Sequence, residues 1–145
     1  MPHQGFMDRR LGEVSGQIAD LVDLVGKALD LAVDGLITPR PELGIEARAI
    51  EDEVDRLDGA LERDCQDLMA LRSPLAGDLM RLITSMRLTL IIEDIGDQAE
   101  SIARRGRYLA LHHLVERPPE LLALAETVRR CFRRAVALID RADQA

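Results

Sequence analysis

The sequence predicts an all-α fold, an antiparallel up-down bundle of long helices forming one domain over residues 1–145. Three observations support this. Aromatic residues make up only 2% of the chain, so the core must come from Leu, Ile, Val and Ala, as in packed helices. Apolar residues recur at steps of three and four along extended stretches. Short proline-containing segments separate these stretches, and short breaks make consecutive helices antiparallel neighbours.

The first helix is expected over residues 6–37, where apolar residues form a heptad seam. The members of this seam are Leu11, Val14, Ile18, Leu21, Val25, Ala28, Ala32 and Gly35. Leu24, Leu31 and Leu36 are expected to widen the seam into a core-facing surface. The following segment TPRPELG contains two prolines, which end the helix.

The second and third helices are expected over residues 42–72 and 74–112. The second helix carries an apolar stripe made of Ile50, Val54, Leu57, Leu61, Leu68 and Leu71. Ser73 and Pro74 suit the start of the third helix, because Ser caps a helix and Pro fits its first turn. The third helix continues with Leu79, Leu82, Ile83, Met86, Leu90, Ile92, Ile95 and Ile102.

The fourth helix is expected over residues 118–143, after the helix-breaking segment ERPPE. Its apolar positions are Leu121, Ala125, Val128, Phe132, Ala135 and Ile139. Four arginines on this helix form two pairs spaced by four residues: Arg129, Arg130, Arg133 and Arg134. They are candidates for binding the acidic surface of a partner, with a solvated face as the alternative.

Two acidic stripes accompany the apolar ones. In the segment IIEDIGDQAESI at 91–102, an apolar stripe of the third helix continues as Glu93, Asp97 and Glu100 at steps of three and four. On the second helix, an acidic stripe is displaced by one residue from the apolar stripe and contains Glu51, Asp55, Asp58 and Glu62. Counting at 1.5 Å per residue from the turn near residue 73, Glu51 and Asp55 reach about the same height as Glu93 and Asp97.

Four carboxylates at one height repel one another unless a positive charge lies between them. Divalent or trivalent cations that prefer oxygen ligands are natural counter-ions, so the candidate metal ligands are Glu51, Asp55, Glu93 and Asp97. Asp58, Asp94 and Glu100 are possible additional ligands or part of the same acidic face. The alternative is that both stripes border solvent and are hydrated.

Charge and motifs exclude several classes of function. The net charge is −7, and an acidic body argues against nucleic acid as the main partner. The start MPHQGFMDRR lacks an apolar signal region, and no apolar run approaches membrane-spanning length, which favours a cytoplasmic protein without membrane insertion. The two cysteines, Cys65 and Cys131, are expected to be reduced. The chain shows no nucleophile–base arrangement and no nucleotide motif, so we do not expect an enzyme.

The segment SPLAGDLMRLITSMRLTLIIEDIGDQAESIA resembles the signature of the PhoU family, regulators of phosphate transport. The segment IEDEVDRLDGALE resembles the companion acidic motif, and the resemblance covers roughly residues 11–108. It implies metal clusters, notably of iron, at Glu51 with Asp55 and at Glu93 with Asp97. It also implies two partners: the ATPase of a phosphate importer and a membrane-bound sensor histidine kinase.

The chain departs from the family pattern at several positions. Ser73 stands where Gln is usual, Met80 where Arg is usual, and Asp94 where Arg is usual, so the site is more acidic. Family members usually hold two three-helix repeats, whereas this chain has one repeat and a fourth helix that resembles the start of a second. A single repeat leaves an apolar face uncovered, so we expect a homodimer.

Two alternatives stay open. One is a non-enzymatic helical adaptor that regulates another transporter or channel, with hydrated acids. The other is a metal-binding carboxylate bundle for storage or redox work. A di-iron oxidase is disfavoured, because such sites use Glu-x-x-His pairs and none of His3, His112 and His113 follows a Glu by three residues.

Overall fold

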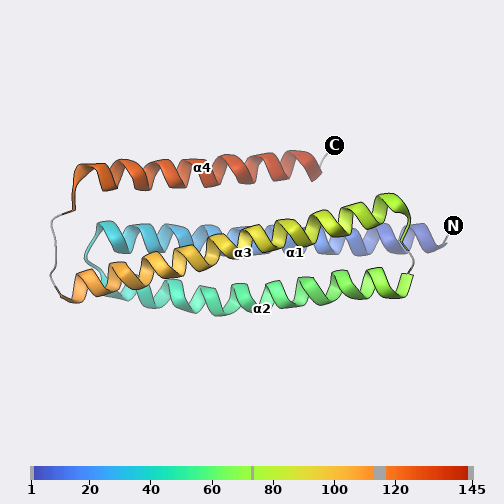
Figure 1. The fold of residues 1–145 in the computed structure, drawn as a ribbon, viewed down its shortest axis with the longest axis horizontal. Coiled ribbons are helices and arrows are strands. Elements are labelled where there is room, and N and C mark those ends of the chain that lie inside the picture. The colour runs from blue at the N-terminus through green and yellow to red at the C-terminus, as the bar shows by residue number, and fades with distance from the viewer. Residues whose placement is uncertain (1, 73, 113–116, 144–145) are drawn as a thin grey trace.

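The computed structural model describes residues 2–72, 74–112 and 117–143, and in these residues the chain is helical without strands (Figure 1). The helices are α1 (Pro2–Ile37), α2 (Pro41–Arg72), α3 (Ala76–Leu111) and α4 (Pro119–Asp143). Consecutive helices run in opposite directions (Figure 1), which confirms the predicted all-α, up-down architecture.

The helix ends differ slightly from those predicted. Helix α1 begins at Pro2 rather than at residue 6, and α3 begins at Ala76 rather than at residue 74. Leu75 precedes α3 with an extended backbone (φ −64°, ψ 161°) and provides no side-chain cap. The expected cap Ser73 lies outside the described residues, as do His113 and the side chains of His3 and Leu71.

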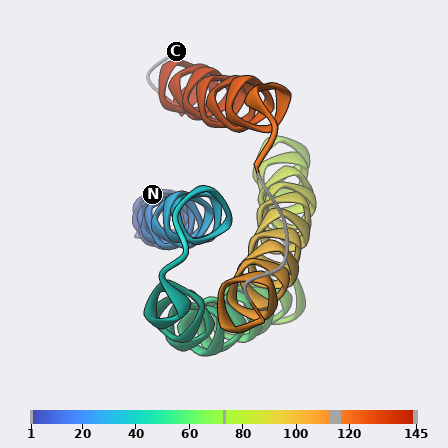
Figure 2. The same ribbon diagram turned by 90° about the vertical axis from the view of Figure 1, so that its left-hand side faces the viewer.

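Helices α1, α2 and α3 form a three-helix bundle in which each helix packs against the other two. Within the described residues, α4 packs only against α1. Figure 2 shows α4 on the far side of α1 from α2. The largest fully buried side chains come from the three bundle helices: Leu11, Leu21, Leu61, Leu82, Val14, Val25, Val54 and Cys65.

The predicted seam of α1 is buried along its whole length, from Leu11 to Gly35. Leu24 and Leu31 are half-buried and pack against the core, as expected, whereas Leu36 is half-buried outside both core clusters. The fully buried face also includes Val22, Leu29 and Val33. Helix α4 approaches α1 on this side, and Leu29 lines the space between them together with Phe132.

The predicted apolar positions of α3 are confirmed in part, because Leu82 and Ile92 are buried and Met86, Ile95 and Ile102 pack against the core. Leu79 and Leu90 are instead 37% and 61% exposed. The buried face of α3 consists of Asp78, Leu82, Thr89, Ile92, Gly96, Ala99, Ala103, Gly106 and Ala110. Small residues dominate its second half because α1 approaches very closely there. A Cβ on Gly106 would lie 3.0 Å from the carbonyl carbon of Gly35 and from the backbone nitrogen of Leu36.

Gly106→Ala is therefore expected to lower the free energy of unfolding by about 1–3 kcal/mol, because backbone atoms of α1 would have to move. This loss exceeds the gain of up to about 1 kcal/mol that Ala brings over Gly within a helix. Gly16 is the matched control, since a Cβ there meets nothing within 4 Å. Gly16→Ala should stabilise the chain. Urea denaturation followed by circular dichroism measures both, and equal stabilisation would contradict the close approach.

Candidate functional site between helices α2 and α3

Glu51 lies on the buried face of α2 rather than beside it. It follows Ala47 by four residues and precedes Val54 by three, so all three share one side of the helix. Ala47 and Val54 are fully buried, and Glu51 is only 7% exposed. Asp58 continues the same face and is half-buried. The predicted one-residue offset between the acidic and apolar stripes is therefore wrong for Glu51 and Asp58.

The carboxylate of Glu51 occupies space that Gly96 of α3 leaves open. A Cβ on Gly96 would lie 3.4 Å from Glu51 Oε2, and equally close to side-chain carbons of Val25 and Val54. Both carboxylate oxygens of Glu51 are buried and have no hydrogen-bond partner among the described residues. A buried charge in this position costs free energy unless another group compensates it.

Acidic residues of two helices act together on Glu51. The pKa of Glu51 is raised from 4.5 to about 7, first by burial and then by the negative charges of Asp55, Asp97, Glu100 and Glu93, in that order. The structure therefore brings Glu51, Asp55, Glu93 and Asp97 within electrostatic range of one another, as the equal heights predicted. We call these four residues the acidic cluster.

Burial and nearby negative charges also act on Glu93, a member of the acidic cluster, and on Asp58. The pKa of Glu93 is raised by burial first and then by the charges of Asp97, Asp58, Asp94 and Asp55. The pKa of Asp58 is raised by burial first and then by Glu62 and Asp55. Asp58 also lines a cavity of about 230 Å³ between α2 and α3, together with Cys65 and Met86. Of the three additional candidates, Asp58 is the one whose surroundings most resemble those of the acidic cluster, because burial and neighbouring acids raise its pKa.

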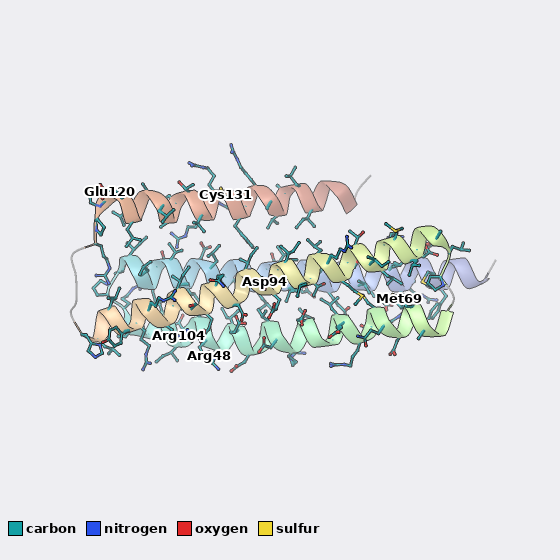
Figure 3. All side chains as sticks on the ribbon, in the orientation of Figure 1. Arg48, Met69, Asp94, Arg104, Glu120 and Cys131 are labelled. Atoms are coloured by element: carbon teal, nitrogen blue, oxygen red, sulfur yellow. The ribbon has the colours of Figure 1, made fainter. Side chains whose placement is uncertain are left out.

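The other two additional candidates have different surroundings. Glu100 accepts hydrogen bonds from Arg48 at 3.0 Å and from Arg104 at 3.2 Å, so its charge is already compensated. These two arginines lie near each other on α2 and α3 (Figure 3). Asp94 lies midway along α3 and lines the space between α3 and α4 (Figure 3).

The acidic cluster has the donor chemistry of a site for a hard cation. Carboxylate oxygens are the ligands that such ions prefer, and Glu51 offers two oxygens without a partner. Within the described residues, no three His, Cys, Asp or Glu side chains converge into one metal-ligating group. Asp55 and Asp97 are exposed, so their side chains can turn toward Glu51 without repacking the core. Metal binding stays a prediction.

Arg129, predicted to bind a partner, forms ion pairs within the chain. Its Nε lies 2.8 Å from Asp30 Oδ1, and its Nη2 lies 2.6 Å from Asp34 Oδ1, both on α1. Its side chain is only 14% exposed. Arg129 thus attaches α4 to α1 within the chain, whereas Arg130, Arg133 and Arg134 are exposed.

None of the helices, over the residues described, contains a stretch long and apolar enough to cross a membrane. Cys65 is a buried free thiol, and Cys131 is an exposed one.

The PhoU domain family model matches residues 18–106, more than half of the chain and all four residues of the acidic cluster. The phosphate-specific transport system accessory protein PhoU homolog of Aquifex aeolicus is 34% identical over 111 residues, covering 77% of this chain and 48% of that protein. The homolog with the same name from Zymomonas mobilis is 30% identical over 126 residues, covering 87% and 53%.

The structure agrees with this similarity. A crystal structure of PhoU from Pseudomonas aeruginosa superimposes with a TM-score of 0.87 at 26% identity, covering 92% of this chain and 65% of that one. The chain spans about half the length of the curated relatives it matches. On the match over residues 18–106, together with these relatives, the chain belongs to the PhoU family.

Proposed function

We propose that this chain regulates phosphate uptake and phosphate-responsive signalling through contacts with protein partners. The match to the PhoU domain over residues 18–106 carries this proposal, because it contains both acidic motifs. The similar proteins are named accessory proteins of a phosphate-specific transport system. Long helices with exposed charged faces suit regulation by surface contact and not by the making of bonds.

The proposed partners are the cytoplasmic ATPase of a phosphate importer and a membrane-bound sensor histidine kinase. The acidic surface of the bundle favours contact with basic surfaces on either protein. The exposed arginines of α4 provide a second surface of opposite sign. We propose that the regulator acts in the cytoplasm and as a homodimer.

We further propose that the acidic cluster holds a divalent or trivalent metal ion, with iron favoured by the family resemblance. Glu51, Asp55, Glu93 and Asp97 would hold it. The ion supplies positive charge that compensates the buried carboxylate of Glu51 and the repulsion between α2 and α3. Metal binding would thereby stabilise the helix faces that partners contact.

The test of the regulatory function is recovery of partners from native cells. The tagged chain should retain the importer ATPase or the sensor kinase, and recovery should fall as the salt concentration rises, because the contact is between opposite charges. An unrelated helical protein of similar negative charge is the control bait. Recovery of subunits of a different transporter, or salt-independent recovery of nucleic acid, would contradict the proposal.

A further inference from the structure

An apolar groove runs between α3 and α4, with α1 as its floor. Its volume is about 610 Å³. The apolar side chains lining it are Leu29 from α1, Ile91, Ile95 and Ile102 from α3, and Val128 and Phe132 from α4. The groove exists because α4 packs on α1 and makes no contact with α3 in the part of the chain described.

The apolar side chains on the walls of the groove are more exposed than is usual for a protein surface that remains in contact with water. Ile91 is 57% exposed and Val128 is 37% exposed, although both are large apolar residues. Contiguous apolar surface of this kind marks an interaction site, and the charges beside it indicate which kind of partner fits.

The charges beside the groove are complementary to each other. Asp94 lies on the α3 wall. Arg130 and Arg134 are exposed on α4, each adjacent in sequence to a residue that lines the groove. A two-fold axis would set the α4 of each copy against the α3 wall of the other, so that arginines meet Asp94 twice. A small apolar ligand would leave these charges unpaired.

We propose that a second copy of this chain covers the groove, with the α4 of each copy lying along the α3 wall of its partner. The inference rests on the proposed homodimer and names the surface that forms it. The dimer buries Ile91, Val128 and the exposed thiol of Cys131, which also lines the groove. An interface centred on apolar residues with a charged rim is the usual anatomy of stable association.

The first readout is mass by light scattering across a concentration series. The wild-type chain should show twice its 16.1 kDa mass. The double variant Ile91→Gln, Val128→Gln should dimerise at least about tenfold more weakly, because central apolar contacts dominate interface energy. Leu90→Gln is the matched control: Leu90 is 61% exposed but lines the cavity facing α2, so its dimer should be unchanged. A wild-type monomer at tens of micromolar (~10⁻⁵ M, well above the Kd of stable homodimers) would overturn the proposal.

The second readout needs no variant. Cys131 is the exposed thiol and Cys65 is buried, so maleimide labelling of the folded chain reports on the groove. Labelling of Cys131 should slow as the protein concentration rises through the dimer transition. A dimer in which Cys131 labels as fast as in the monomer would refute the groove as interface while leaving a homodimer through another surface. The partner-recovery experiment tests the regulatory function separately.

Discussion

Glu51→Gln should stabilise the chain by about 3 kcal/mol at pH 8 in the presence of a chelator. The reason is that the wild-type chain must bury the charge of Glu51, whose pKa is raised from 4.5 to about 7. The amide carries no charge and occupies nearly the same volume. Neither carboxylate oxygen of Glu51 has a hydrogen-bond partner among the described residues, so the substitution removes the charge without breaking a hydrogen bond.

The pH dependence follows from the direction of the pKa shift. Between pH 4.5 and about pH 7, the folded chain retains a proton on Glu51 that the unfolded chain releases. The wild type therefore loses stability as the pH rises through this window, whereas the variant does not. The difference between them should be small at pH 4.5 and full above pH 7. Urea denaturation across this range measures it.

The control for this series is Asp67→Asn, a change at an exposed acid of α2. It should stay within about 0.5 kcal/mol of the wild type at every pH, as exposed substitutions do. A Glu51→Gln difference that does not vary with pH would show that Glu51 has the same pKa in the folded and the unfolded chain, and would contradict a cost for burying its charge.

The helices themselves could be predicted from the sequence, because the three-and-four spacing and the prolines are local signals. The seam of α1 was confirmed, since large apolar residues from Leu11 to Val25 define its first part and its small residues continue the same spacing. The buried face of α3 could not be found in this way. Its second half is built from Gly96, Ala99, Ala103 and Gly106, which are buried because neighbouring helices come close and not because they are strongly apolar. Leu90 is more hydrophobic than any of them and yet is exposed.

The proximity of the acidic residues was predictable, because equal distances from one turn give equal heights on antiparallel helices. The depth of Glu51 was not, since it depends on the space left by Gly96 of another helix. Only one of the two arginines that compensate the charge of Glu100 could be predicted from the sequence. Arg104 follows it by four residues on the same helix, but Arg48 comes from α2. The attachment of Arg129 to α1 likewise depends on packing between distant segments.

The second large expected effect is stabilisation by metal. If the acidic cluster surrounds a cation, binding should add about 2.7 kcal/mol to the free energy of unfolding at a hundredfold excess over Kd. Glu93→Gln should raise the stability of the metal-free chain, because the pKa of Glu93 is already raised by burial and by neighbouring charges. Asp97→Asn should do so less, since Asp97 is exposed. Both variants should lose most of the gain from metal.

The central claim is that the acidic cluster is a cation site and not a hydrated surface. Its most direct test is the free energy of unfolding of the wild type, Glu93→Gln and Asp97→Asn, each with chelator and with iron, manganese, magnesium or zinc. The account predicts that at least one metal stabilises the wild type strongly and both variants weakly, while Asp67→Asn responds like the wild type. If no metal stabilises the wild type more than it stabilises the two amide variants, the acidic cluster does not bind metal.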